Sequence, residues 1–257
     1  MKSVDFQVFV LVRAWNNYAY LEECLASIFS QKGLKKFTIL LIDDCSDYTK
    51  LQQKKLTRSL FNHKYIRNRF KKYGIRNAYE VIHQFVPNNA IVINVDGDDW
   101  LSTPHSLQLI LNQYHDPNCW LSYGHPNLIS MTNQLRFFSS QKISPRRYSQ
   151  QSEELNSYRR EFFLPSHPRS WRSSLFKKIK IKDLKRPNGD WLRFCEDQAF
   201  FFPMLEMAHG KYSVLNQDVY NYRVEYAESD YTLNLKEKFF DELCIRLKDI
   251  YATINQL

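Results

Sequence analysis

The sequence predicts an α/β fold in which a mixed, mainly parallel sheet is flanked by helices. Strand-like and helix-like segments alternate along residues 1–115, as they do when a helix returns the chain to a parallel strand. In addition, two of the predicted strands end in groups of aspartate. Ligands of open α/β sheets bind beyond the carboxyl ends of the strands, so these groups indicate a functional edge.

The first strand, helix and strand cover residues 6–42. Residues 6–12 (FQVFVLV) combine β-branched and aromatic side chains and predict a buried strand. Residues 20–30 have apolar side chains at helical spacing, and Gly33 ends this helix. Residues 37–42 (FTILLI) predict the second strand. The chain therefore opens with two parallel strands joined by a helix.

The remaining elements are predicted from the same two periodicities. They are a helix and a short strand within 50–75, a helix over 76–86, a strand over 90–95, a helix opening at Ser102-Thr103-Pro104, and helices over 196–208 and 235–254. Residues 139–152, rich in Ser, Gln and Arg, predict a loop. We expect one continuous domain, with a more regular half (1–115) and a less regular half (116–257) that ends in a helix.

The composition indicates a globular protein with an excess of positive charge. Lys and Arg (36) outnumber Asp and Glu (27), which gives a net charge of +9. This charge favours an anionic partner, such as nucleic acid, an acidic membrane surface or a phosphorylated substrate. Because no apolar stretch approaches the ~20 residues of a membrane span, we expect a cytoplasmic protein. The five cysteines lack the spacing of a disulfide framework or a zinc site.

Carboxylates gather at the ends of two predicted strands. Asp43 and Asp44 follow the second strand, and Asp96, Asp98 and Asp99 follow the third. Like charges this close repel one another unless a cation lies between them, and oxygen ligands suit Mn²⁺ or Mg²⁺. The sequence therefore predicts a divalent metal site at the third strand. The alternative is an acidic turn that caps the following helix.

Five segments follow one another along nearly the whole chain. They are a strand, polar turn and helix (VFVLVRAWNNYAYLEECLASIF), a strand ending in two acids (ILLIDDCSD), a helix with an Arg-Asn pair (GIRNAYEVI), a D-x-D sequence (VDGDDW) and a Glu-Asp pair at a helix start (FCEDQAFFF). In this order they resemble the family 2 glycosyltransferases of the GT-A fold, the Rossmann-like fold of nucleotide-diphospho-sugar transferases. The resemblance implies that residues 1–115 form a nucleotide-sugar-binding half and residues 116–257 an acceptor-binding half.

The resemblance implies roles for the residues that match. A nucleoside diphosphate sugar, with a UDP-sugar favoured, would bind at Trp15, Asp43, Asp44, Arg76, Asp96, Asp98, His167 and Arg169, and Mn²⁺ or Mg²⁺ would bind at Asp96, Asp98 and Asp99. Arg13-Ala14-Trp15-Asn16 replaces the Pro-Thr/Ser-Tyr-Asn turn of many relatives, which leaves uridine, guanosine and thymidine open. Turn formation by Asp43 and Asp44, a solvated Arg76 and a structural His167 are the alternatives.

The Glu-Asp pair matches the position of the general base in this family. The resemblance implies that Asp197 removes the proton of an acceptor hydroxyl, that Glu196 supports it or binds the acceptor, and that the anomeric centre is inverted. The alternative is that both acids only stabilise the start of a helix. Arg223, in YNYRV, matches a frequent C-terminal arginine that contacts phosphate or packs.

Two other functions are alternatives to sugar transfer to a glycan, lipid-linked or protein hydroxyl. A nucleotidyltransferase shares such a sheet but usually has a glycine-rich turn after the first strand, and RAWNN has no glycine. A basic nucleic-acid-binding protein would use the net charge of +9, but acids at the sheet edge repel phosphates. We therefore expect no nucleic acid partner, and peripheral contact with an anionic membrane as a further expectation.

Overall fold

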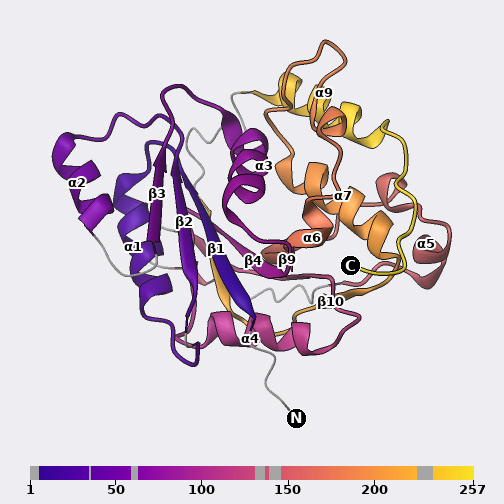
Figure 1. Cartoon of the computed structure of the whole chain (residues 1–257), viewed down its shortest axis with the longest axis horizontal. Coiled ribbons are helices and arrows are strands. Elements are labelled where there is room, and N and C mark those ends of the chain that lie inside the picture. Colours follow the sequence, from indigo (N-terminus) through magenta and orange to yellow (C-terminus); the bar gives the residue numbers. More distant parts are fainter. Residues whose placement is uncertain (1–5, 35, 59–62, 131–136, 139–145, 225–233) are drawn as a thin grey trace.

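The computed structural model describes residues 6–34, 36–58, 63–130, 137–138, 146–224 and 234–257. Its centre is a sheet in the strand order β10-β6-β9-β4-β1-β2-β3 (Figure 1). The strands are β1 (Gln7–Ala14), β2 (Thr38–Asp43), β3 (His63–Arg67), β4 (Ala90–Asp96), β6 (Leu121–Gly124), β9 (Ser166–Arg172) and β10 (Tyr212–Val214). The sheet thus draws strands from both halves of the chain.

Most pairs in this sheet are parallel, as the sequence predicts. β1 pairs in parallel with β2 and β4, β2 with β3, and β6 with β10. β9 lies antiparallel between β4 and β6, which makes the sheet mixed. Parallel register aligns the carboxyl ends of β1, β2 and β4 at one edge, where their polar end residues meet.

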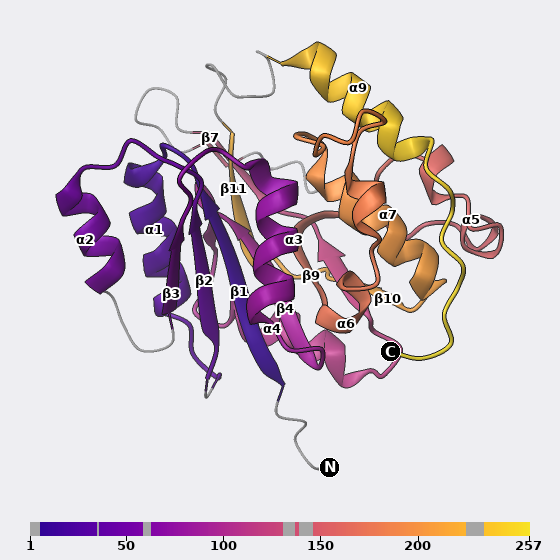
Figure 2. The same cartoon turned by 45° about the horizontal axis from the view of Figure 1, so that its top comes forward.

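Helices cover both faces of the sheet (Figures 1 and 2). The alternating side chains of β1 enter two separate cores: Val10 packs in a core with residues of α1, α2 and α4, whereas Leu11 packs in a core with residues of α3, α6, α7 and α9. The helices are α1 (Tyr18–Phe29), α2 (Lys50–Arg58), α3 (Tyr73–Phe85), α4 (Ser106–Asn112), α6 (Ser173–Phe176), α7 (Glu196–Ala208) and α9 (Leu235–Arg246). Burial on both faces explains why β1 and β4 read as nearly continuous apolar runs.

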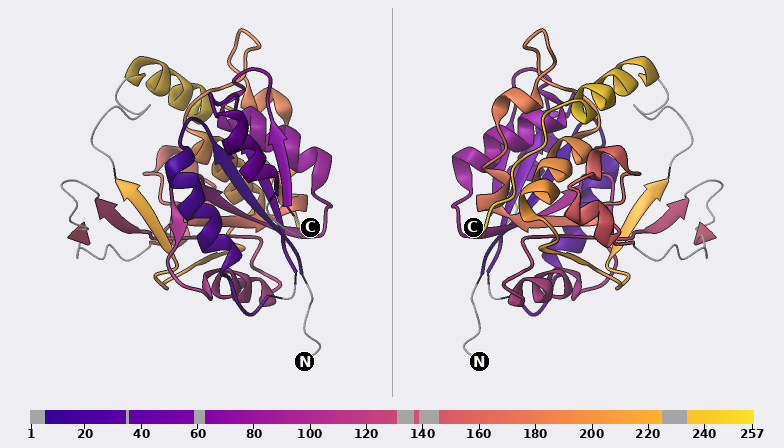
Figure 3. Two further views of the ribbon diagram at one scale, coloured as in Figure 1. Left: turned by 90° about the vertical axis from the view of Figure 1, so that its left-hand side faces the viewer. Right: turned by 90° about the vertical axis from the view of Figure 1, so that its right-hand side faces the viewer.

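A second, smaller sheet lies to one side of the first (Figure 3). Its order is β5-β11-β7-β8, with β5 (Trp100–Leu101), β11 (Tyr220–Val224), β7 (Asn127–Ser130) and β8 (Phe137–Phe138). β5 pairs antiparallel with β11 directly after the D-x-D sequence. This pairing fixes the turn of residues 96–99 against the C-terminal part of the chain.

Several short elements connect the longer helices and strands along the chain. They include α5 (Gln150–Glu154) and the 3₁₀ turns η1 (Gln113–His115), η3 (Tyr158–Arg160) and η4 (Ile181–Leu184). A buried ion pair ties η3 to α7: Arg159 Nε lies 2.5 Å from Glu206 Oε1, and Arg159 Nη2 donates to Glu206 Oε2 at 2.9 Å. No helix of the described residues is long and apolar enough to cross a membrane.

Three predicted boundaries were wrong. The helix expected at residues 102–104 begins at Ser106, because the hydroxyls of Thr103 and Ser106 accept backbone N–H groups in the turn before it. The helix expected over 235–254 ends at Arg246, since the N–H of Tyr251 donates to Glu206 and draws the chain along α7. In the expected loop 139–152, residues 139–145 lie outside the described residues, and α5 begins at Gln150.

Candidate active site

Asp96 lies at the end of β4, at the carboxyl edge of the parallel strands. Its Oδ1 accepts hydrogen bonds from Arg13 Nη2 at 2.9 Å and from Asn94 Nδ2 at 3.0 Å, and its Oδ2 lies 3.4 Å from His167 Nε2. Burial raises the pKa of Asp96, but its interactions with His167, which is protonated only in acid, and with Arg13 and Arg169 outweigh burial and lower the pKa to about 2. Asp96 is therefore an anion at neutral pH.

Arg13, at the end of β1, connects Asp96 to the helix that starts at Glu196. One terminal nitrogen of its guanidinium donates to Asp96 and to Asn94, and the other contacts Glu196 Oε2. Gly74, in the first turn of α3, lies against this contact, since a Cβ there would meet Glu196 and Arg13. The ends of β1 and β4 and the starts of α3 and α7 therefore meet around one guanidinium.

Asp99 is buried and held from two sides. Its Oδ2 accepts a 2.8 Å hydrogen bond from the hydroxyl of Tyr220, and its Oδ1 accepts a 2.9 Å hydrogen bond from the backbone N–H of Arg223. The side chain of Arg223 donates to the carbonyl of Asp98 and pairs with Glu23 at 2.6 Å. Burial, together with Asp98 and Asp96, raises the pKa of Asp99 well above its usual range. Arg223 was expected either to contact phosphate or to pack, and its contacts with Asp98, Asp99 and Glu23 support packing.

Gly97 allows the turn of residues 96–99 to lie close against the backbone of β1. Its N–H donates to the carbonyl of Arg13 at 3.0 Å, and a Cβ would lie 2.5 Å from that oxygen. Any side chain at this position would push the turn of residues 96–99 away from β1.

His167, at the start of β9, faces Asp96. Its ring stacks on Tyr220 with the centroids 4.8 Å apart, and its Nδ1 is buried without a hydrogen-bond partner among the described residues. Burial and the charges of Arg169 and Arg13 lower the pKa of His167 to about 3. The imidazole is therefore neutral at pH 7 and offers a lone pair.

The chemistry of these side chains fits a divalent cation. Asp96, Asp99 and His167 place one ligand atom each within 4.8 Å of one another. Two carboxylates and a neutral imidazole suit a borderline ion such as Mn²⁺ better than Mg²⁺, which prefers oxygen ligands. Asp98 is exposed and does not belong to this group. The structure therefore adds His167, predicted for donor contact, to the candidate metal ligands.

The Glu-Asp pair begins α7 beside the group around Asp96. Asp197 Oδ2 accepts a 3.0 Å hydrogen bond from Arg169 Nη2, and Arg169 comes from β9, the strand that also carries His167. Glu196 contacts Arg13. Arg13 therefore links Glu196 to the end of β4, and Arg169 links Asp197 to β9.

Asp43 and Asp44 are engaged within the fold. Asp43 accepts hydrogen bonds from the N–H of Ser46, the hydroxyl of Tyr65 and Arg67 Nε, at 2.8, 2.7 and 3.1 Å. Asp44 accepts from the side chain of Asn68 and from the N–H groups of Lys72 and Tyr73, each at 2.8 Å. Asp44 thus stabilises the start of α3, which begins at Tyr73, three residues before Arg76. These contacts support the turn interpretation.

Trp15 and Arg76 lie in different surroundings. Trp15 is 42% exposed just after β1, and Lys71 Nζ lies 3.0 Å from the centre of its ring. Arg76 Nε pairs with Glu80 Oε1 at 2.7 Å, one turn further along α3. The structure does not bring Arg76 into the group around Asp96, whereas Trp15 directly follows the strand that carries Arg13.

Sequence reasoning gave no site role to Arg13, Asn94 or Tyr220. Two signals were available: Asn94 is a polar residue inside an apolar strand, and Arg13 ends a buried strand. In parallel register Arg13 pairs with Asp96. Tyr220 carried no such signal, because its contact with Asp99 spans 121 residues.

The sequence matches one family model, described as Glycosyl transferase family 2, over residues 9–180. No curated protein sequence matches the chain. Among solved structures, the chain is similar to S. aureus TarS 1–349 in complex with UDP, at 21% identity and a TM-score of 0.57, covering 86% of this chain and 61% of that chain.

Two further structures are similar. TarS 1–349 in complex with UDP-GlcNAc has 19% identity and a TM-score of 0.59, covering 87% of this chain and 60% of that one. The mannosyltransferase PcManGT from Pyrobaculum calidifontis, in complex with GDP-Man and Mn²⁺, has 14% identity and a TM-score of 0.54, covering 84% and 56%. The chain spans about 60% of the length of these proteins. The likeness confirms the expected GT-A fold.

Proposed function

The chain belongs to glycosyl transferase family 2, and on that premise we propose that it transfers a sugar from a nucleoside diphosphate sugar to a hydroxyl group, with inversion. One observation carries this proposal: Asp96, at the end of β4, and Glu196, beside Asp197 at the start of α7, are bound by the same guanidinium. Residues for a donor diphosphate and for proton removal therefore share one edge of the sheet.

Asp96, Asp99 and His167 would hold the divalent cation, with the exposed Asp98 next to them. A bound Mn²⁺ or Mg²⁺ neutralises the charge that develops on a leaving diphosphate. Arg13 and Arg169 keep positive charge beside these carboxylates, so the diphosphate approaches an edge that is not purely acidic. UDP and GDP sugars bound to similar proteins support a nucleotide-sugar donor, and we propose a UDP-sugar first.

Asp197 is the proposed general base. Its carboxylate is held by Arg169 and by the N–H of Gln198, so it faces the reaction in a fixed orientation. In a single displacement it takes the proton of the attacking acceptor hydroxyl while the sugar leaves the diphosphate. Trp15, exposed beside Arg13, is the proposed stacking surface for the base of the nucleotide.

The acceptor is proposed to be a glycan, lipid-linked or protein hydroxyl. The net charge of +9 supports a peripheral position at an anionic membrane, where such acceptors occur.

A thermal-shift panel of UDP, GDP and TDP sugars, with Mn²⁺ and with EDTA, tests the proposal. At a hundred times Kd, a donor should raise the melting temperature by about 5–10 °C when Mn²⁺ is present. No shift with any donor would contradict the proposal. A shift of equal size in EDTA would contradict the role of the metal but not the binding of the donor.

A further inference from the structure

α9 exposes an apolar surface to solvent. Residues 235, 239, 243 and 247 are four apart, so they share one side of the helix. Together with a neighbouring phenylalanine they form what we call the α9 face: Leu235 (58% exposed), Phe239 (70%), Phe240 (46%), Leu243 (44%) and Leu247 (75%). A surface helix usually turns its apolar residues inward, so this face requires another explanation.

The opposite side of α9 carries acids instead. Asp241 is fully buried, and Arg186 pairs with it at 2.6 Å and with Glu237 at 3.0 Å. Arg193 also pairs with Glu237, at 3.4 Å. The acids of α9 are thus neutralised by neighbouring arginines on the protein side, and the α9 face is left apolar apart from the exposed Lys236.

A basic segment flanks α9. Residues 177–186 (KKIKIKDLKR) contain five lysines, one arginine and one aspartate. They are attached to the helix by Arg186 and by Lys248, whose Nζ donates to the carbonyl oxygens of Lys182 and Lys185 at 3.4 and 2.9 Å. Ile181, within the basic segment, is 44% exposed. Figure 2 shows α9 along one edge of the molecule with the chain that precedes α7 beside it.

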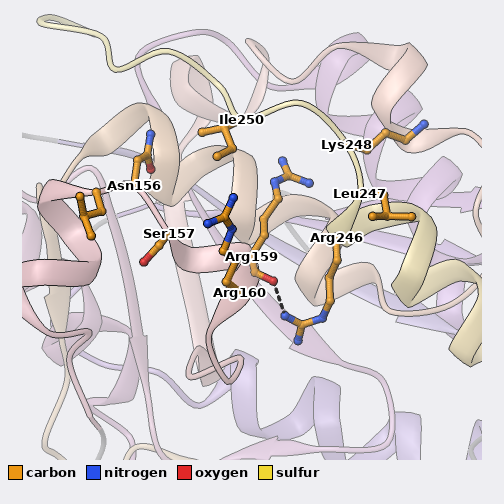
Figure 4. Close-up of a pocket in the computed structure, with 9 residues that line it drawn as sticks. Asn156, Ser157, Arg159, Arg160, Arg246, Leu247, Lys248 and Ile250 are labelled. Carbon is orange, nitrogen blue, oxygen red and sulfur yellow. Dashed lines mark hydrogen bonds between the residues drawn. The ribbon is translucent and has the colours of Figure 1, made fainter.

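A pocket of about 580 Å³ continues this surface beyond the C-terminal end of α9 (Figure 4). Its walls include the apolar side chains of Leu155, Leu247 and Ile250 and the cationic side chains of Arg160 and Lys248. Arg160 is exposed, and the carbonyl partners of Lys248 carry no net charge. An anionic group can therefore be received there next to apolar chains.

We propose that the α9 face, the basic segment and this pocket form a docking surface for a bilayer that contains anionic lipids. The apolar side chains would enter the acyl boundary, and the flanking lysines and Arg160 would contact lipid phosphates. Charge decides between a bilayer and a second copy of the chain. Two copies joined through α9 would bring Lys236 and two basic segments together, whereas anionic lipids neutralise them.

This inference deepens the proposed function, because it rests on an acceptor that is presented at a membrane. The α9 face adjoins the proposed catalytic helix: Gln198 Nε2, in the first turn of α7, donates to Glu242 Oε1 at 3.1 Å. A docked α9 would hold Asp197 near the bilayer surface.

Sedimentation with vesicles tests the inference without reading out transfer. The full chain should sediment with vesicles of phosphatidylcholine mixed with phosphatidylglycerol, and poorly with phosphatidylcholine alone. Phe239→Ser combined with Leu243→Ser should weaken binding at least about tenfold. Lys180→Glu with Lys182→Glu should weaken it as well. Leu51→Ser, at a residue of α2 that is 66% exposed, is the matched control and should bind like the unaltered chain.

The inference is overturned if the unaltered chain does not bind anionic vesicles, or if the α9 double variant binds as well as the control. Light scattering measures the mass in solution and so tests whether a second copy of the chain occupies the α9 face instead. A dimer that the α9 double variant abolishes, without vesicle binding by the unaltered chain, would assign the α9 face to a second copy. The donor-induced thermal shift should persist in the double variant, so failure of docking is distinguishable from failure of the proposed transfer.

Discussion

Arg13 donates a 2.9 Å hydrogen bond to Asp96 across the parallel pair of β1 and β4. The same guanidinium contacts Glu196, which follows Asp96 by 100 residues in the sequence. It therefore joins the proposed metal site to the helix of the proposed base, and the site depends on a residue outside the D-x-D sequence.

Replacing Arg13 with methionine should lower the transfer rate at least about tenfold, equivalent to ~1.4 kcal/mol, because Asp96 and Glu196 would face each other without a cation. Arg13→Lys should restore part of the rate, since an ammonium keeps the charge but not the two-sided geometry. Initial rates at saturating donor and acceptor measure this. A methionine variant with an unaltered rate would contradict the role of Arg13.

Asp197→Asn should lower kcat by about 10²–10⁴-fold, because the amide cannot accept the hydroxyl proton. Donor binding should survive, so the thermal shift with a donor and Mn²⁺ should stay as large as in the unaltered chain. Asp190→Asn, at an exposed aspartate in the turn before α7, is the control and should keep its rate. Equal rates for the two variants would remove Asp197 from the reaction.

Glu206→Gln should reduce the free energy of unfolding by about 3–5 kcal/mol, since it leaves the charge of Arg159 buried without its partner. Glu242→Gln is a matched change in a more exposed pair with Arg246 and should cost less than about 1 kcal/mol. Urea denaturation measures both. Similar losses in the two variants would mean that burial does not set the strength of the Arg159 pair.

The free energy of unfolding should fall at alkaline pH because Tyr148 titrates there. Burial raises the pKa of Tyr148 to about 12, whereas an unfolded tyrosine has a pKa of ~10. The folded state therefore holds the proton more tightly, so this contribution to stability is complete below the unfolded pKa and is lost as the pH rises toward the folded one. The slope is at most ~1.4 kcal/mol per pH unit.

Tyr148→Phe removes this titration. Urea denaturation of both chains at several pH values above ~9 should give a shallower pH profile for the variant. Parallel profiles would show that Tyr148 does not titrate differently in the two states.

Local patterns sufficed for strands β1 to β4 and for most of the longer helices, whereas the positions of β6, β9 and β10 were not predicted. The apolar runs predicted at 6–12, 37–42 and 90–95 became β1, β2 and β4, and the helix predicted at 196–208 has the bounds of α7. These elements are buried on both faces or carry strong periodicity, so the sequence alone identifies them. The end of α9 depended on the contact of Tyr251 with Glu206, which no local pattern reveals.

The site was predictable only in part, because its contacts are long-range. The D-x-D sequence and the Glu-Asp pair located the edge. The partners of each acid come from distant strands: Arg13 for Asp96, Tyr220 for Asp99 and Arg169 for Asp197. Asp43 and Asp44 have the same local signature as Asp96, yet their partners close a turn and begin α3. Residue type alone does not separate these two uses of aspartate.

Electron paramagnetic resonance of Mn²⁺ tests the central claim most directly, because only the free aqueous ion gives a strong six-line signal. Adding the protein with UDP should remove that signal, and Asp96→Asn should leave most of it. If the unaltered chain leaves the signal of free Mn²⁺ intact, or if Asp96→Asn removes it equally well, the edge around Asp96 does not bind the metal.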